Sequence, residues 1–190
     1  MSNLNLSNFP KEMLVDENIF IRTFTPEHIT EFSEIVFSDI EHLSIWLDWV
    51  EGLTKNDLNI WYKKSCEQVP NIRSIKLQMF VDKKLVGVIN TKQRYPEDIH
   101  IEIGYWLASF ATGKGVVTKC AKTLIDLCFE NSDIPYIEIA CDEANLASSA
   151  VAKRLAFTFN REVIITPHLP AETGVGHFYR FTRVDWKSKQ

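Results

Sequence analysis

The sequence lacks most of the features that would place it in a specialised class of protein. No apolar run approaches the ~18 residues of a membrane-spanning helix, and no signal peptide precedes Asn18. An excess of positive charge is also missing, because 21 Lys and Arg residues stand against 25 Asp and Glu, a formal net charge of −4. Nucleic-acid binding requires a basic face. We therefore expect a cytoplasmic protein with neither a membrane nor nucleic acid as its main partner.

Metal-binding and two nucleotide-binding patterns are absent too. Cys66, Cys120, Cys128 and Cys141 are scattered, without the paired spacing of a metal site, so we expect reduced, mostly buried thiols and no metal. The segment Gly113-Lys114-Gly115 lacks the second Gly-Lys-Ser/Thr of a P-loop. It also lacks the third glycine and the downstream acidic residue of a dinucleotide fingerprint.

What remains is an ordinary globular chain without internal repeats. Its 190 residues predict one domain, residues 1–190, with residues 1–17 as a loosely held lead-in. Helices are predicted from Pro26, from Thr54 to about Gln68, after Gly115, and from Asn145 to Leu155. Strands are predicted at 19–24, 75–81, 85–89, 99–107, 136–141, 157–165 and 178–184. This order predicts an α+β or mixed α/β fold.

The most informative stretch runs from Ile103 to Ala121. A strand ends there in a loop of small residues, and two glycines one residue apart lead directly into a helix. The start of a helix leaves backbone N–H groups free, and the helix dipole favours negative charge at that end. The stretch is therefore suited to a phosphate or pyrophosphate, although plain turn chemistry is the commoner reason for such glycines.

Four segments together resemble the GNAT family of acyl-coenzyme A N-acyltransferases, most closely its RimJ/RimL-like branch. They cover most of residues 19–160 and are the opening strand at 21–24, the aromatic segment at 42–50, the strand and glycine loop at 102–115, and the segment at 145–157. The resemblance implies a GNAT fold of the α+β class. Its mixed, mostly antiparallel sheet has seven strands flanked by helices, and it splays between the fourth and fifth strands, here 99–107 and 136–141.

The resemblance also implies a binding site for acetyl-CoA. Backbone N–H groups of the glycine loop would hold the pyrophosphate, and the pantetheine arm would enter the splay and pair with backbone of the fourth strand. Asn145 would bond the pantetheine, or cap the helix that follows it, or both. The implied cofactor-binding residues are Tyr105, Trp106, Leu107, Thr112, Gly113, Lys114, Gly115, Val116, Val117 and Asn145.

Two residues are the candidates for catalysis. Ser148 matches the family's serine that donates a proton to the leaving thiolate, with a surface helix serine as the alternative. The general base departs from the family pattern, because Pro167 stands where close relatives carry a glutamate. Glu102 is the favoured replacement, and His168 or Glu172 is the alternative.

Three functions stay open at this point. The favoured one is an acetyltransferase that moves an acetyl group from acetyl-CoA to a protein N-terminal amine, such as that of a ribosomal protein. A second is acetylation of a small amine, either a polyamine or an aminoglycoside. A third is a CoA-binding sensor or interaction domain that has lost turnover, which the missing glutamate suggests. A homodimer is expected from the resemblance alone.

Overall fold

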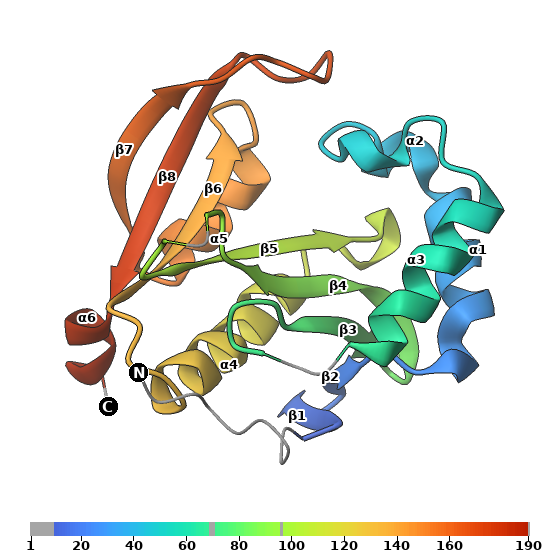
Figure 1. Cartoon of the computed structure of the whole chain (residues 1–190), viewed down its shortest axis with the longest axis horizontal. Helices are drawn as coiled ribbons and strands as arrows, with labels where there is room; N and C mark the ends of the chain where they lie inside the picture. Colours follow the sequence, from blue (N-terminus) through green and yellow to red (C-terminus); the bar gives the residue numbers. More distant parts are fainter. Residues whose placement is uncertain (1–9, 69–70, 96, 190) are drawn as a thin grey trace.

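The computed structural model describes residues 10–68, 71–95 and 97–189, and a single mixed sheet runs through them (Figure 1). Its eight strands lie in the order β1-β2-β3-β4-β5-β6-β8-β7. All neighbours are antiparallel except β5 and β6. The strands are β1 (Glu12–Asp16), β2 (Ile19–Thr23), β3 (Lys76–Val81), β4 (Lys84–Lys92), β5 (Ile101–Leu107), β6 (Tyr136–Asp142), β7 (Thr158–Ile164) and β8 (Val175–Thr182).

Helices cover both faces of this sheet. The group on one side comes from the segment between β2 and β3, and the group on the other side follows β5 and β6 (Figure 1). None of the described helices is long and apolar enough to cross a membrane. The α-helices are α1 (Ile29–Ser38), α2 (Ile40–Leu43), α3 (Lys55–Glu67), α4 (Val116–Glu130), α5 (Leu146–Arg154) and α6 (Arg183–Lys187). Short 3-10 helices are η2 (Pro26–His28), η3 (Asp48–Val50) and η4 (Ser109–Ala111).

The N-terminal strand β1 corrects the expected irregular lead-in, and it raises the strand number from seven to eight. Met13 lies opposite Ile21 of β2, and Met13 and Val15 pack against the main hydrophobic core. The pattern was too short and too mixed in polarity to read as a strand. Its second anchor, the ion pair of Asp16 with Lys119 of α4, joins residues far apart in the chain. Residues 1–9 lie outside the described part.

Alternation along β5 separates two hydrophobic cores. Ile101 and Ile103 point to the face that α4 covers, and they belong to the larger core with Cys120, Leu124 and Cys128. Trp106 points to the other face, where it packs against a second core built around α1 and α3. We call these the α4 face and the α3 face. The residues of the second core are Phe24, Phe32, Val36, Leu43, Val50, Leu58, Tyr62, Phe80, Leu85 and Val88.

The predicted splay lies between β5 and β6. These two parallel strands are paired only at Ile101 with Ile137 and at Glu102 with Glu138, and they diverge beyond that point. The expected fold is therefore confirmed, with the additional strand at its N-terminal edge. Because the splay opens at the centre of the sheet, any molecule within it meets both faces.

Candidate active site

The loop before α4 leaves a row of backbone donors open. Gly113 and Gly115 both have φ of +74°, a left-handed conformation that glycine adopts without strain, and Gly115 caps α4. Among the described residues, no acceptor bonds to the backbone N–H groups of residues 113–118. A Cβ atom added at either glycine would meet nothing within 4 Å. The loop therefore fits a pyrophosphate, which needs convergent donors and close backbone approach.

Cationic side chains surround this loop. The Nζ atom of Lys114 folds back to donate to the carbonyl oxygen of Phe110 at 3.1 Å. From α5, the Nε atom of Arg154 lies 3.4 Å from the Oγ1 atom of Thr118. Both cations add to the positive end of the α4 dipole. Arg154 was not predicted, because only the packing of α5 against α4 brings it to the loop.

The register of β5 decides which of its backbone groups face the splay. Ala108 donates its N–H to the carbonyl oxygen of Val86, so residues 108, 106, 104 and 102 turn their backbone groups toward β4. Tyr105 and Leu107 therefore face the splay. Trp106, also predicted to pair with the pantetheine, has its backbone engaged with β4 instead. A Cβ atom added at Gly87 of β4 would lie 2.2 Å from the carbonyl oxygen of Trp106, which explains why that position is glycine.

Ser148 and Tyr105 meet at the open end of the splay. The Oη atom of Tyr105 lies 2.9 Å from the Oγ atom of Ser148, and either hydroxyl can donate. Ser148 is held there by the cap of α5, since Asn145 Oδ1 accepts the Ser148 backbone N–H at 3.0 Å. Asn145 is thus the N-cap, as one of its two interpretations predicted.

The environment of Tyr105 keeps its hydroxyl protonated. Burial raises the pKa of Tyr105 to about 12, against the opposing hydrogen bond with Ser148. Cys141 of β6 borders the same pair, where burial raises the pKa of its thiol and a hydrogen bond with Ser148 opposes the rise. The pair therefore offers protons, while Cys141 stays an uncharged thiol. Sequence reasoning assigned Tyr105 only a backbone role, and its hydroxyl gave no signal.

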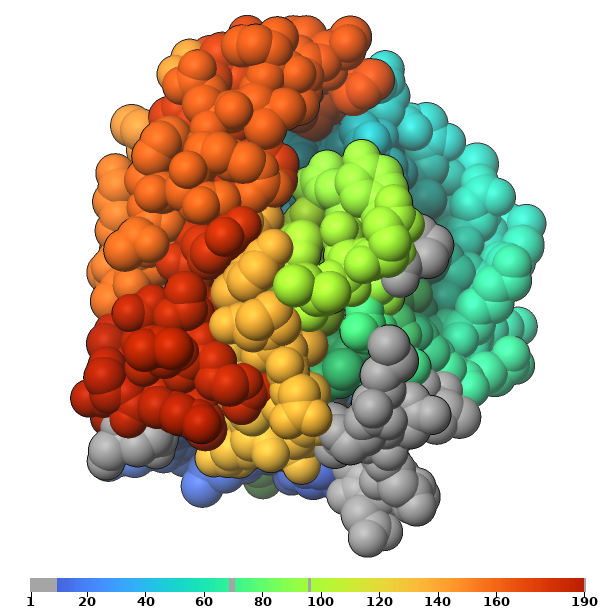
Figure 2. All heavy atoms as spheres, turned by 60° about the vertical axis from the view of Figure 1, so that its left-hand side comes forward, coloured from blue at the N-terminus to red at the C-terminus, as the bar shows by residue number. Residues whose placement is uncertain are grey.

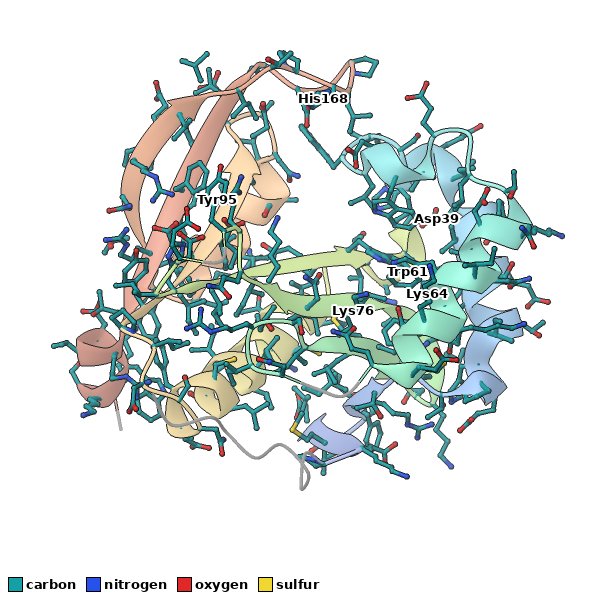
Figure 3. The ribbon with its side chains drawn as sticks, in the orientation of Figure 1. Asp39, Trp61, Lys64, Lys76, Tyr95 and His168 are labelled. Atoms are coloured by element: carbon teal, nitrogen blue, oxygen red, sulfur yellow. The ribbon has the colours of Figure 1, made fainter. Side chains whose placement is uncertain are left out.

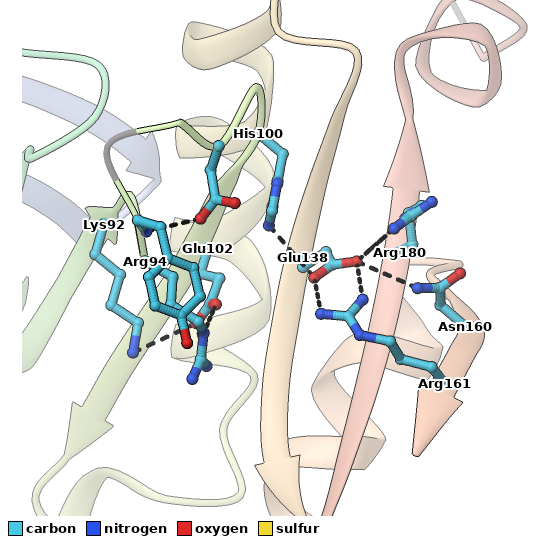
Figure 4. A network of polar contacts seen from close by, with 10 residues as sticks. Lys92, Arg94, His100, Glu102, Glu138, Asn160, Arg161 and Arg180 are labelled. Atoms are coloured by element: carbon cyan, nitrogen blue, oxygen red, sulfur yellow. Dashed lines mark hydrogen bonds and ion pairs between the residues drawn. The ribbon is translucent and has the colours of Figure 1, made fainter. Parts of the chain in front are cut away.

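Glu102 does not join this pair, because it points to the α3 face. Its side chain is 2% exposed, and its carboxylate accepts from Arg94 Nε at 2.5 Å and Nη2 at 2.9 Å (Figure 4). Lys92 Nζ lies 3.4 Å from the same carboxylate. Glu102, the favoured general base, is therefore a buried ion-pair partner that lies apart from the hydroxyl pair.

A second buried carboxylate, Glu138, lies beside Glu102 in the parallel register. Arg161 binds it through Nη1 and Nη2 at 2.7 and 3.0 Å, and Arg180 Nη2 lies at 2.9 Å (Figure 4). His100 adds a contact of 3.5 Å from Nε2. Burial would raise the pKa of Glu138, but these arginines outweigh it and lower that pKa.

The other base candidates lie on the loop between β7 and β8. Glu172 Oε2 accepts the backbone N–H groups of His168 and Leu169 at 2.6 and 3.1 Å, so it organises its own loop. His168 lies on the outer part of that loop (Figure 3). Asp142 anchors the loop to β6 by accepting from the backbone of Thr173 at 3.0 Å. The structure brings neither His168 nor Glu172 to Ser148.

The large aromatic side chains of α3 and η3 are divided between core and surface. Tyr62 is fully buried, whereas Trp61 is 39% exposed, and its ring lies 5.0 Å from Nζ of Lys76 (Figure 3). Trp49, 40% exposed, contacts the Trp106 ring with centroids 6.4 Å apart. Beyond them opens a pocket of about 520 Å³ between residues 40–52 and the β7–β8 loop. Its lining is mostly apolar and includes Ile40, Ile45, Val50, Leu169, Pro170 and Ala171.

The aromatic segment is tied to the end of β5. Asp39 accepts from the backbone N–H of Ser109 at 2.6 Å and from its hydroxyl at 2.7 Å. His42 Nε2 lies 3.3 Å from the carbonyl oxygen of Leu107. One end of β5 therefore joins three features: the glycine loop, the Ser148–Tyr105 pair and the apolar pocket.

A splayed sheet with this loop and hydroxyl pair is the geometry expected of an acyl-CoA transferase. The model of the acetyltransferase (GNAT) domain matches residues 18–158. The chain belongs to the GNAT acetyltransferase family. This enzyme thus carries its family domain over most of its length.

Named relatives agree with this assignment. The chain is 27% identical over 148 residues to YdaF of Bacillus subtilis (strain 168), which carries the name of a ribosomal N-acetyltransferase. That match covers 75% of this chain and 79% of the relative.

Two solved structures share the fold. A RimL ribosomal L7/L12 alpha-N-protein acetyltransferase in complex with coenzyme A superposes with a TM-score of 0.81 at 20% identity, covering 90% of this chain and 97% of that one. The microcin C7 self-immunity acetyltransferase MccE, in complex with acetyl-CoA and AMP, gives a TM-score of 0.82 at 21% identity, covering 91% and 97%. At such identities the likeness establishes the fold alone.

Proposed function

We propose that this acetyltransferase moves the acetyl group of acetyl-CoA directly to a protein N-terminal α-amine. One observation carries the proposal: the Ser148–Tyr105 hydroxyl pair lies at the splay beside the open donors of residues 113–118. The names of the relatives YdaF and RimL support a protein α-amine, and a ribosomal protein is the acceptor class we favour.

The donor would be held mainly by backbone. Its pyrophosphate would lie on the open N–H groups of residues 113–117. The predicted donor Thr112 is excluded because its N–H donates to the carbonyl oxygen of Ser109 at 3.2 Å. The pantetheine would pair with Tyr105 and Leu107 inside the splay. A free backbone N–H of β5 at this level would stabilise the negative charge that develops on the thioester oxygen. Ser148 would then donate its hydroxyl proton to the leaving thiolate, and Tyr105 would pass its own proton to Ser148. Both hydroxyls are protonated at neutral pH, and burial raises the pKa of Tyr105 to about 12.

The amine must lose a proton as it attacks. We propose Glu102 as the acceptor of that proton through a chain of waters, because it lies on the α3 face of β5, three residues or about 10 Å from Tyr105. Arg94 and Lys92 hold its carboxylate in a fixed position. A weak base is sufficient for an N-terminal α-amine, whose pKa is about 7.7–8.0.

Titration calorimetry with acetyl-CoA, followed by thiol release on a panel of amines, tests the proposal. The panel contains peptides with N-terminal Ser or Ala, a polyamine and an aminoglycoside. Binding with release on the peptides is the expected result. Thiol release only with the polyamine or the aminoglycoside would identify a small amine as the acceptor. Binding of acetyl-CoA without release on any amine would identify a CoA sensor. No binding at millimolar acetyl-CoA would contradict the donor site itself.

We also propose that the protein works as a homodimer in the cytoplasm, without nucleic acid or membrane. The edge strand β7 supports a protein contact, since Phe159 and Ile164 are 55% and 77% exposed and the strand lies open along one side of the molecule (Figure 2). Exposed apolar edge strands pair readily with other chains. Analytical ultracentrifugation of the wild type and of Ile164→Lys tests it, and a monomer in both would contradict it.

A further inference from the structure

The two buried carboxylates on the α3 face bind more cationic side chains than they can neutralise. Lys92, Glu102, Glu138 and Arg180 follow one another in register across β4, β5, β6 and β8. Arg94 and Arg161 join this line from either side, each with its guanidinium over the ring of Phe178, at 5.3 and 4.0 Å. We call the four cations, Lys92, Arg94, Arg161 and Arg180, the cationic row.

These cations stay accessible although they are held in place. Their side chains are 55%, 38%, 39% and 30% exposed, in the order of the row, whereas the two carboxylates are 2% and 0% exposed. Four cations against two carboxylates leave two positive charges on the surface of a chain with a net charge of −4. A guanidinium has five N–H donors, so each arginine keeps donors beyond those directed at Glu102 or Glu138, although Asn160 also accepts from Arg161 and Arg180.

Glu97, Asp98 and Arg73 lie near the row, and together they leave it one of its two excess positive charges. Glu97 and Asp98 belong to the loop that carries Arg94, and Asp98 Oδ2 accepts the Tyr95 backbone N–H at 2.8 Å. Arg73, whose Nη1 donates to the Asp98 carbonyl oxygen at 2.8 Å, adds a further cation there. In Figure 2 this light-green segment lies between the C-terminal hairpin and the helical segment around residues 40–65.

The position of the row relates it to the acceptor. It crosses β5 at Glu102, four residues from Trp106, and at about 3.3 Å per residue this separation is roughly 13 Å. The α4 face is taken by the proposed donor, so the acceptor approaches from the α3 face, where the row lies. An extended peptide whose α-amine reaches the level of Tyr105 to Leu107 covers the same distance in about four residues.

We propose that the enzyme selects acceptor proteins with acidic side chains at about the third to fifth residue, and that the cationic row binds them. This inference rests on the proposed N-terminal acetylation and names the acceptor class within it. The row is prepared before binding, because ion pairs to buried carboxylates and stacking on Phe178 already fix its side chains. Fixed donors lose little entropy when a carboxylate arrives.

The test compares octapeptides that begin with Ser and carry a single Asp or a single Asn at each position from 2 to 8. The expected result is a kcat/KM about fivefold higher for Asp than for Asn at positions 3–5, and a smaller ratio elsewhere. The ratio should fall toward one as salt rises, since the row is exposed. Equal rates for Asp and Asn at every position, with thiol release on all peptides, would overturn the acidic preference and leave the acetyltransferase proposal intact. No release on any peptide would instead contradict the proposed function.

Variants assign the preference to the row. Lys92→Glu and Arg161→Gln should each lower the ratio of kcat/KM between Asp and Asn peptides. Either variant also disturbs Glu102 or Glu138 and can change the overall rate, but such a change affects both peptides equally and cancels in the ratio. Lys122→Glu makes the same charge change on α4, where Lys122 pairs with Asp126, and it should leave the ratio unchanged. A ratio that survives in both row variants, or that falls equally in Lys122→Glu, would overturn the assignment.

Discussion

The two sides of the splay differ in which groups form the site: backbone groups dominate one side and side chains the other. On the α4 face the site consists of backbone N–H groups, two left-handed glycines and a cap, with Ser148 and Tyr105 as the proposed reacting side chains. On the α3 face it consists of charged and aromatic side chains fixed by one another around Glu102 and Glu138. A backbone site depends on fold and binds the donor that the family shares. A side-chain site changes with every substitution, so we propose that the α3 face selects the acceptor of this chain.

Ser148→Ala should have the largest effect, because it removes the proposed proton donor on the α4 face. We expect kcat to fall about 100-fold with little change in acetyl-CoA affinity. Tyr105→Phe should produce a similar loss, and the double variant should be little worse, since both hydroxyls serve one proton path. Thiol-release assays measure kcat, and calorimetry measures the affinity for acetyl-CoA. A kcat within twofold of the wild type in Ser148→Ala would remove the serine from the mechanism.

Glu138→Gln tests the α3 face as a structural unit. Arg161 and Arg180 would lose their buried partner, and we expect the free energy of unfolding to fall by about 2 kcal/mol at pH 7, reduced from buried-pair values because both arginines reach solvent. The lowered pKa of Glu138 means that its contribution is present above the usual value of 4.5 and is lost as the pH falls through the folded pKa. We measure the free energy of unfolding by urea titration at several values between about pH 3 and 7. This free energy should depend less on pH in the variant than in the wild type. Parallel curves would contradict the role of this ion pair.

Gly115→Val should weaken the donor site by adding a side chain where φ is +74°. The backbone strain of 1–3 kcal/mol for a residue in this region predicts an acetyl-CoA affinity lower by about tenfold. Gly52→Val is the matched control, since Gly52 has φ of +66° and equally open surroundings. Both variants should lose similar stability, and only Gly115→Val should lose acetyl-CoA affinity in calorimetry. Equal losses of affinity would assign the effect to general strain.

Cys141→Ala should have the smallest effect. The thiol borders Ser148, but burial raises its pKa, and a protonated thiol is a poor nucleophile. We expect kcat to change by less than about twofold. Acetyl transfer that stops in this variant, with a covalent acetyl-cysteine trapped in the wild type, would replace direct transfer by a two-step path.

The sequence predicted the backbone features of the site better than its side-chain contacts. The glycine loop, the caps at Thr54 and Asn145, and the splay depend on local pattern or on family resemblance, and the sequence predicted them. The hydroxyl contact of Tyr105 depends on the packing of α5 against the sheet. The ion pairs of Glu102 and Glu138 depend on strand register and on β7, β8 and the 93–100 loop meeting across the sheet. The contacts of Tyr105 with Ser148 and of Glu138 with Arg180 join residues 43 and 42 positions apart, and Arg94 reaches Glu102 across a loop 8 positions away, so no local pattern records them. β1 was missed because its five residues are mixed in polarity, and because Lys119, which pairs with Asp16, lies 103 positions away.

The most direct test of the central claim locates the acetyl group after reaction. A peptide with an N-terminal serine, acidic residues at positions 3–5 and one internal lysine is incubated with acetyl-CoA, and fragment masses report which nitrogen is modified. The account predicts a single acetyl group on the N-terminal α-amine, with one thiol released for each. Acetylation of the lysine side chain, or an unmodified peptide despite bound acetyl-CoA, would contradict it.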